Sequence, residues 1–258
     1  MNQQNKLPIS VVIIAMNEEL NIARAINSVQ WADEVLVYDS GSTDKTVQVA
    51  ENLGAHIIVG KWMGFGLTKK YASLKAKHNW ILSLDCDEEV SLNLKNEIVE
   101  KLLSPLNEKT AYRIPRASFY LNKWIKYGGW YPDRQTRLFN KMYSNWGAEE
   151  IHEKVKAEQY ENLSNNINHY VFRNIEHQVN TNNRYSSLQA QEMFRMGKKF
   201  SWLLFIIKPY VKFTECYLLK LGFLDGWAGY FIARSAAYSV FLKWSKLYEY
   251  ERELSKKV

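Results

Sequence analysis

The sequence predicts an α/β fold with a mostly parallel, Rossmann-like sheet, followed by a helical C-terminal extension. Short β-branched runs such as residues 9–14 (ISVVII) alternate with segments whose apolar residues recur at helical spacing. Strands separated by helices in this way form parallel sheets with right-handed crossovers. After Arg184 the pattern is helical, with a break expected at Pro209.

Each expected element follows from a local signal. The β-branched run at 9–14 is typical of a strand buried on both faces. Asn17 is a plausible N-cap for the next helix, because Glu18 and Glu19 would then occupy the first turn. Further strands are expected at residues 34–39, 57–59, 80–84 and 111–116, with helices around residues 47–53 and 69–77.

Charge and aromatic residues divide the chain into two parts. The whole sequence has 34 basic and 27 acidic side chains, a net charge of +7. Residues 1–180 are neutral, and residues 181–258 hold the entire excess together with 17 of the 36 aromatic residues. We therefore expect a body at 1–180, divided at residue 110, and a basic extension at 181–258. An anionic or interfacial partner should contact that extension.

Composition excludes several classes of protein. With 47% hydrophobic residues, 5 prolines and 12 glycines, the chain is neither disordered nor fibrous. Two distant cysteines, Cys86 and Cys216, indicate a reducing cytosol and no disulfide framework. No signal-peptide core and no apolar run of about 20 residues is present, so we expect a soluble or peripheral cytoplasmic protein.

Acidic side chains follow the expected strands at one edge of the sheet. Asp39 and Asp85 stand at strand ends, and Asn17 lies just beyond another. Ligands of open parallel sheets bind outside the carboxyl ends of the strands. Strand alternation would send Asp85 and Asp87 to the same side, where they could face a hard divalent cation or a sugar hydroxyl. Asp39 could equally form an Asx turn before Ser40 and Gly41.

These motifs together resemble those of family 2 glycosyltransferases. The resemblance rests on residues 11–19 (VVIIAMNEE), 37–44 (VYDSGSTD) and 85–88 (DCDE), in the same order and spacing. Residues 64–66 with Lys69, 129–139 and 151–153 are similar to the subgroup that includes lipopolysaccharide-core β-glucosyltransferases. The similarity covers nearly the whole chain. It implies a GT-A fold, a nucleotide-sugar donor and transfer with inversion.

The resemblance also implies roles for individual residues in donor binding. Carried over by position, Ala15, Glu18 and Asp39 would hold the nucleoside. Lys69 would lie near the donor diphosphate, and Asp85 would bind the donor ribose or sugar. Residues 1–110 would therefore form the nucleotide-sugar half of the catalytic domain, and residues 111–180 the acceptor side.

A divalent metal, Mg²⁺ or Mn²⁺, is the cofactor that the resemblance implies, and Asp87 would hold it. His152 could orient the site, join the metal, or be an ordinary hydrogen-bonded histidine. His169 has no partner pattern and is expected to be a surface or core residue. One departure concerns Met16, because many family members carry an aromatic residue there, so a softer apolar contact would replace base stacking.

Inversion in one step needs a general base on the acceptor hydroxyl. Glu153, beside His152, is the preferred candidate, and Asp133 in the Pro-Asp-Arg turn is the second. Arg134 and Arg137 could clamp phosphate or an anionic acceptor, or could be structural ion-pair partners of nearby acids.

The function expected from the sequence is transfer of a sugar, glucose, from a UDP-sugar to a lipid-linked glycan such as the lipopolysaccharide inner core. The enzyme would be peripheral on the cytoplasmic face of the inner membrane, its extension against anionic lipid or simply capping the body. The alternatives are another acceptor, protein or polysaccharide, a nucleotidyltransferase, or a nucleic-acid-binding protein. A nucleotidyltransferase would need a Gly-rich basic loop after the first strand, where this chain instead has residues 17–19 (NEE). A nucleic-acid-binding function leaves the strand-end acids unexplained, so no nucleic acid partner is expected.

Overall fold

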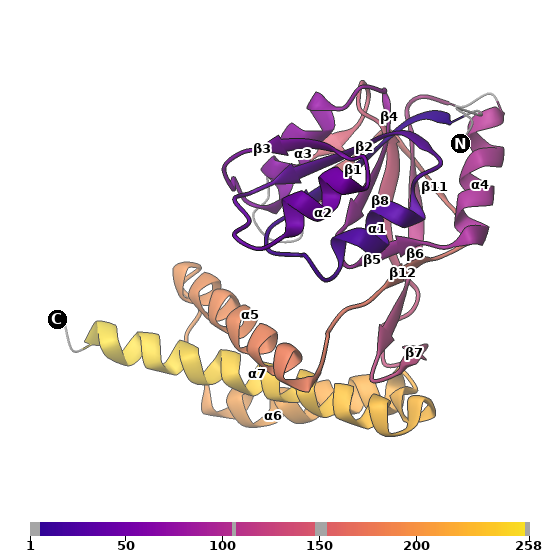
Figure 1. Ribbon diagram of the computed structural model, residues 1–258. Helices are drawn as coiled ribbons and strands as arrows, with labels where there is room; N and C mark the ends of the chain where they lie inside the picture. The colour runs from indigo at the N-terminus through magenta and orange to yellow at the C-terminus, as the bar shows by residue number, and fades with distance from the viewer. Residues whose placement is uncertain (1–5, 105–106, 148–153, 256–258) are drawn as a thin grey trace. The chain divides into compact units, whose positions relative to one another are not determined.

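The computed structural model describes residues 6–104, 107–147 and 154–255 (Figure 1). These residues form two compact units. Unit 1 holds the chain up to Arg116 together with Asp133–His169, and unit 2 holds Ala117–Pro132 together with the chain from Tyr170 onward. Each unit is described by itself below.

Unit 1 is built on a mixed sheet with the strand order β3-β2-β1-β4-β8-β6-β12-β5. The first four strands in this order are mutually parallel, and β8 runs antiparallel to both β4 and β6. The strands are β1 (Leu7–Ala15), β2 (Ala32–Asp39), β3 (His56–Val59), β4 (Trp80–Asp85), β5 (Glu88–Val90), β6 (Thr110–Tyr120), β8 (Asp133–Asn140), β9 (Asn145–Trp146), β10 (Val155–Lys156), β11 (Gln159–Asn162) and β12 (Ile167–His169). The helices are α1 (Ile22–Ser28), α2 (Thr46–Asn52), α3 (Phe65–Lys75) and α4 (Leu92–Leu103).

Side chains from the two faces of this sheet form two separate hydrophobic cores. On β1, Val11 and Ile13 pack in one core with α1 and α2, whereas Val12 packs in the other with Ala72 of α3. Figure 1 shows α1 and α2 on one side of the sheet and α3 on the other. Because β1 is covered on both faces, it tolerates no polar alternation, as its sequence predicts.

The parallel register brings three strand ends to the same edge. Ala15 at the end of β1 lies opposite Asp39 at the end of β2, and Ile14 lies opposite Asp85 at the end of β4. The predicted convergence of polar segments at the carboxyl ends of these strands is therefore confirmed.

Asn17 does not cap a helix, contrary to the sequence prediction. Helix α1 begins at Ile22, and its N-cap position is held by Asn21. Asn17 instead has a φ of 57°, in the left-handed region that asparagine tolerates better than most residues. In this conformation the polar groups of Asn17 form hydrogen bonds with the loop after β2 and not with the first turn of a helix.

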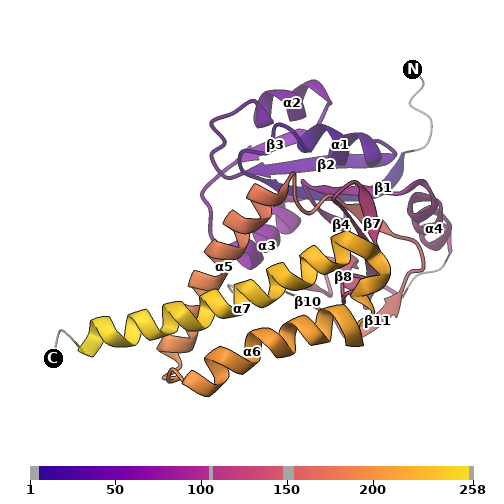
Figure 2. The ribbon, with the colours of Figure 1, turned by 90° about the horizontal axis from the view of Figure 1, so that it is seen from below.

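Unit 2 consists of a short hairpin and three long helices. The hairpin pairs the end of β6 with β7 (Lys123–Ile125). Helices α5 (Ile175–Arg195) and α6 (Trp202–Thr214) both pack along α7 (Gly226–Ser255), as Figure 2 shows. A π-helical turn, Glu215–Leu219, and a 3₁₀ turn, Gly222–Asp225, connect α6 to α7. Asp225, at the end of the 3₁₀ turn, connects the helices to the segment after β7, because its carboxylate accepts hydrogen bonds from the backbone N–H groups of Lys126 and Tyr127.

Pro209 lies inside α6 and does not break it, contrary to the sequence prediction. Aromatic contacts hold the helix on both sides of this residue: Phe205 packs against Phe241 and Phe213 against Tyr230, both on α7. Tertiary packing thus offsets the hydrogen bond that proline removes. In the part of the chain that the structure describes, no helix is both long enough and apolar enough to cross a membrane.

Candidate functional site

The loops after β1 and β2 are joined by reciprocal hydrogen bonds. The Asn17 N–H donates to the Ser42 hydroxyl at 2.8 Å, and the Asn17 side-chain oxygen accepts from the Thr43 N–H at 2.8 Å. The Glu18 N–H donates to Thr46 Oγ1 at 2.7 Å. The signature residues 17–19 and 42–46 therefore shape each other's backbone before any ligand arrives.

Asp39 is buried at the centre of this arrangement, only 1% exposed. Its Oδ1 accepts from the N–H groups of Gly41 and Ser42, at 2.9 and 2.8 Å, and its Oδ2 accepts from the Ser42 hydroxyl at 2.5 Å. This is the Asx turn that the sequence allowed. The next side chain, Ser40, has a buried hydroxyl with no hydrogen-bond partner among the described residues.

A network of six charged side chains surrounds the end of β4. Asp85 contacts the Lys69 ammonium at 3.0 Å and the Arg137 guanidinium at 2.5 Å. Arg137 Nη2 also donates to Glu88 Oε1 at 2.6 Å, and Arg116 Nη1 lies 3.1 Å from the same oxygen. The sixth member is Asp133, which accepts from Arg116 Nε at 2.9 Å. Three carboxylates and three cations balance, so the network is formally neutral.

Three members of this network are buried, and Asp85, Arg116 and Asp133 are partly exposed. Glu88 is fully buried, and Lys69 and Arg137 are 4% and 3% exposed. Burial opposes ionisation of Asp85, yet the Arg137 and Lys69 charges together hold the pKa of its carboxyl well below its usual range. Lys69 and Arg137, expected near phosphate, are thus already paired with carboxylates.

Asp87 lies outside the network. Strand β4 ends at Asp85 and a turn follows, so strand alternation does not extend to Asp87 and the two acids have different partners. The Asp87 side chain is 33% exposed, and its Oδ2 lies 3.4 Å from His169 Nε2. His169 is brought there by the pairing of β12 with β5, where it lies opposite Glu88.

Asp87 fits a divalent-metal site. Mg²⁺ and Mn²⁺ take oxygen ligands and are commonly held by one or two carboxylates with substrate phosphates completing the shell. An exposed carboxylate that pairs with no lysine or arginine among the described residues meets this requirement, whereas Asp85 does not. No group of three metal-ligating side chains occurs within residues 6–104, 107–147 and 154–255.

Four acidic side chains converge around Cys86. Its thiol is buried and donates to the Ile14 carbonyl at 3.2 Å. Burial raises the pKa of this thiol well above its usual value, and the negative charges of Glu18, Asp87, Asp85 and Asp39 raise it further. These carboxylates follow three different strands, whose register brings their carboxyl ends to one edge.

The remaining predicted residues divide into three groups. Ala15 is buried, and its carbonyl accepts from the Ser40 N–H at 2.9 Å. Arg134 is exposed on β8 and donates to the Leu163 carbonyl at 2.9 Å, away from the network. His152 and Glu153 lie outside the described residues, so their predicted roles stay predictions.

Sequence reasoning missed three residues of this site. Glu88 stands within the DCDE motif but received no role, and Arg116 and His169 carry no local signal. Arg116 lies opposite Asp133 in the β6–β8 pairing, and His169 opposite Glu88 in the β12–β5 pairing. Only the antiparallel pairings of distant segments bring these side chains to the strand ends.

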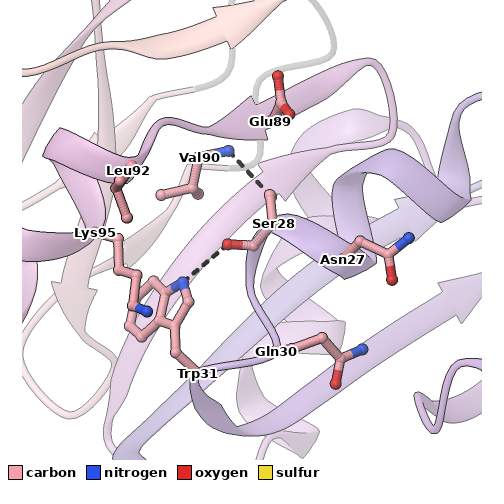
Figure 3. A pocket seen from close by; sticks show the side chains of 8 residues that line it. All are labelled: Asn27, Ser28, Gln30, Trp31, Glu89, Val90, Leu92 and Lys95. Carbon is pink, nitrogen blue, oxygen red and sulfur yellow. Dashed lines mark hydrogen bonds between the residues drawn. The ribbon is translucent and has the colours of Figure 1, made fainter.

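A separate shallow pocket of about 290 Å³ lies between α1, β5 and α4 (Figure 3). Its frame is fixed by two hydrogen bonds: the Val90 N–H donates to Ser28 Oγ at 3.0 Å, and the Trp31 indole donates to the Ser28 carbonyl at 2.9 Å. None of the residues predicted to bind donor, acceptor or metal lines it. The pocket is lined by Asn27, Ser28, Gln30, Trp31, Glu89, Val90, Leu92 and Lys95.

Comparison with known proteins identifies the family. The family model of Glycosyl transferase family 2 matches residues 10–174. An uncharacterized glycosyltransferase of Rickettsia typhi is 35% identical over 273 residues, covering 96% of this chain and 88% of that protein. The lipopolysaccharide core biosynthesis glycosyltransferase LpsC of Rhizobium meliloti is 25% identical, covering 95% of this chain and 93% of its own.

Among solved structures, glucosyl-3-phosphoglycerate synthase from Mycobacterium tuberculosis is 28% identical over 43% of each chain, with a TM-score of 0.34. The family assignment rests on the sequence matches, which extend over unit 1 and, for the relatives, nearly the whole chain. The fold agrees with them: a GT-A-like α/β domain with a helical C-terminal region. This chain belongs to glycosyl transferase family 2 and is a glycosyltransferase, for which a nucleotide-sugar donor is supported.

Proposed function

We propose that this glycosyltransferase moves glucose from a UDP-linked donor to a lipid-linked glycan, such as the lipopolysaccharide inner core, with inversion at the anomeric carbon. The acceptor class is supported by LpsC, whose name states lipopolysaccharide core biosynthesis and which aligns along nearly all of this chain. The observation that carries the proposal is the register that brings Asp39 and Asp85 together at the carboxyl edge of the parallel strands.

An acidic strand edge suits a nucleotide sugar only if a cation lies between carboxylate and diphosphate. Asp87 is the residue proposed to hold that divalent metal, with His152 or His169 beside it. When bound, the metal offsets the negative charge that develops on the leaving diphosphate. Asp85 is proposed to contact the donor ribose or sugar, held in position by Lys69 and Arg137.

The chemical step is proposed as a single displacement. The acceptor hydroxyl oxygen forms a bond to the anomeric carbon as the bond from that carbon to the nucleoside diphosphate breaks. The hydroxyl proton passes to a carboxylate, for which Glu153 is the preferred candidate. Asp133 is less suited as the base. Burial raises the pKa of its carboxyl, but the charge and hydrogen bond of Arg116 lower that pKa by more, so the net pKa is lowered and Asp133 is a weaker base.

A donor screen by thermal unfolding tests this proposal. UDP-, GDP- and CMP-sugars are compared with and without Mn²⁺, and UDP-glucose with Mn²⁺ is expected to raise the melting temperature most. At a ligand concentration of 100 times Kd the stabilisation is about 2.7 kcal/mol. Stabilisation by GDP- or CMP-sugars alone would overturn the UDP assignment, and no response to any donor would contradict the donor site. Proton NMR of the product then reports the anomeric configuration.

The proposed nucleoside role of Asp39 can be separated from its turn. Asp39→Asn is expected to lower UDP affinity about tenfold, because the amide changes the hydrogen bonds offered to a nucleobase N–H. Ser42→Ala is the control for the turn, since it removes the hydrogen bonds that the Ser42 hydroxyl makes with Asp39 and with the Asn17 N–H, and leaves the carboxylate. Calorimetric titration with UDP measures both. If the two variants lose stability equally and keep their UDP affinity, Asp39 is a turn residue only.

The acceptor and the cellular place are proposed together. A lipid-linked acceptor would locate the enzyme peripherally at the cytoplasmic face of the inner membrane, in agreement with the basic, aromatic extension at 181–258. Transfer of labelled glucose is expected to a lipopolysaccharide core precursor in preference to a protein or a free polysaccharide. Labelling of protein or polysaccharide instead would favour the alternative acceptors.

A further inference from the structure

Helix α6 has an apolar face that no part of unit 2 covers. None of its residues is buried, although its sequence is strongly apolar. Leu203, Ile206 and Tyr210 are 66%, 56% and 71% exposed, and their spacing of three and four residues places them on one face. The face as a whole is formed by Leu203, Ile206, Ile207, Tyr210 and Val211, and Trp202 lies at its margin, where its ring also packs against Tyr248 of α7.

The same helix uses another side to pack on α7. Phe205 and Phe213 point to that side, with ring centroids 5.1 Å from Phe241 and 5.9 Å from Tyr230. A helix that is apolar on more than the side it packs with normally has a second apolar neighbour, which can be protein or membrane. With 13 residues, α6 is too short to span a bilayer but long enough to lie in its interface.

Exposed apolar residues continue beyond α6 around the connection to α7. Leu219 and Trp227 are 77% and 62% exposed, and between them the two short helical turns expose further large side chains. Monomeric proteins rarely leave contiguous apolar surface of this kind open to water. These residues are Leu218, Leu219, Leu221, Phe223, Leu224 and Trp227.

Four lysines accompany this surface. Lys208 and Lys212 lie one turn apart on α6, and Lys243 lies on α7, against which α6 packs. Burial lowers the pKa of Lys243, and the positive charges of Lys198, Lys208 and Lys212 lower it further. Lys212 pairs with Glu215 at 3.1 Å. For Lys198, Lys208 and Lys243, the described residues provide no carboxylate within ion-pair distance. Three of the four lysines in this cluster therefore have no carboxylate partner among the described residues, and the fourth is paired with Glu215.

We propose that the α6 face, continued by the turns before α7, lies in the headgroup–acyl boundary of an anionic phospholipid bilayer, with the lysine cluster against lipid phosphates. This inference deepens the proposed function and rests on it for the choice of a membrane. Tryptophan and tyrosine suit that boundary because they are apolar with one polar end. Each lysine near an anionic surface contributes on the order of 1 kcal/mol of binding.

Other occupants fit this surface less well. Two copies packed face to face about a two-fold axis would bring like-charged lysine clusters together. Single-stranded RNA would satisfy the lysines and could stack on Tyr210 and Trp227, but it would leave the aliphatic side chains of this surface in water. The combination of aliphatic and cationic side chains is matched by a phospholipid surface.

Vesicle flotation of the full chain tests the proposal. The protein is mixed with vesicles of neutral phosphatidylcholine, or with vesicles containing about 30% phosphatidylglycerol, at low and high salt. We expect at least tenfold stronger binding to the anionic vesicles at low salt. Equal flotation with both compositions, or none with either, would overturn the proposal. Dimerisation in light scattering or tighter binding to RNA, without vesicle binding, would overturn it in favour of those partners.

Matched variants locate the surface. Leu203→Glu with Ile206→Glu is expected to weaken vesicle binding at least tenfold. Leu92→Glu with Leu103→Glu, which changes two leucines that are 69% and 76% exposed on α4, should bind like the wild type. Thermal unfolding confirms that each variant folds. Lys198→Glu with Lys208→Glu should remove the preference for anionic vesicles, and added inorganic phosphate should not compete if lipid, and not free phosphate, is the ligand.

Donor hydrolysis is measured on the same proteins to keep the two proposals apart. The α6 variants should hydrolyse UDP-glucose like the wild type, since none of the changed residues lies in the strand-edge site. Vesicle binding without any donor activity would support the membrane surface and contradict the proposed function. Donor activity without vesicle binding would do the reverse. Unchanged vesicle binding of the α6 variant would show that another surface carries the attachment.

Discussion

Replacing Arg137 with methionine is expected to lower the free energy of unfolding by about 3–5 kcal/mol, because it leaves buried carboxylates without their cation. Arg137 is 3% exposed and joins Asp85 to Glu88, which is fully buried. Methionine has a similar length, so the loss comes from charge and hydrogen bonding more than from a cavity. Urea-induced unfolding followed by fluorescence measures the change.

Arg134→Met is the matched control for this prediction. Arg134 lies three residues earlier on β8, is exposed, and makes one hydrogen bond to the Leu163 carbonyl. Its replacement should cost no more than about 1 kcal/mol. If Arg137→Met unfolds within about 1 kcal/mol of the wild type, the carboxylates around it are hydrated and the network contributes little.

The pH dependence of the Arg137 effect gives a second readout. Because the folded-state pKa of Asp85 is lowered, the ionised carboxyl stabilises the fold above its unfolded pKa of about 3.9 and loses that contribution as pH falls. Removing Arg137 raises the pKa of Asp85 toward its usual value. The difference in unfolding free energy between wild type and Arg137→Met should therefore be constant from neutral pH down to about 5 and shrink as the pH falls below about 4, toward the lowered folded-state pKa.

Local sequence signals were sufficient for the parallel strands β1–β4 and the edge where they end, but not for β5 and β7–β12. The run at 9–14 is buried on both faces, and a continuous apolar run is the sequence pattern that such a strand requires. Asp39 and Asp85 were predicted to converge because parallel strands share one carboxyl edge, and the register confirms it. This part of the fold needs only short-range patterning and the handedness of the crossovers.

The ionic network could not be predicted in the same way. Glu88 and Arg116 are 28 residues apart, and their contact depends on antiparallel strands that join the sheet far along the chain. The predictions of a helix cap at Asn17 and a helix break at Pro209 were wrong for a related reason. At each position a tertiary contact, with the loop after β2 or with α7, outweighed a local preference of the backbone.

Replacing Asp87 with asparagine is expected to weaken Mn²⁺ binding in the presence of UDP, and to lower sugar transfer, by at least about 100-fold. The amide is isosteric but neutral, and a neutral oxygen is a poor ligand for a hard cation. The fold should be retained, because Asp87 is 33% exposed and its ion-pair partner among the described residues is His169. Calorimetric titration of Mn²⁺ measures affinity, and donor turnover measures activity.

Asp33→Asn provides the control, since the Asp33 side chain is also 33% exposed but is paired with Lys77 and His78 at the opposite end of β2. It should leave Mn²⁺ affinity unchanged. The contrast with Asp85 explains why Asp87 is chosen: a carboxylate already neutralised by Lys69 and Arg137 gains little from a third cation. Asp85 and Asp87 of the DCDE motif would then have different roles, Asp85 positioning a hydroxyl and Asp87 binding metal. Undiminished Mn²⁺ affinity in Asp87→Asn would place the metal on other residues and remove that division.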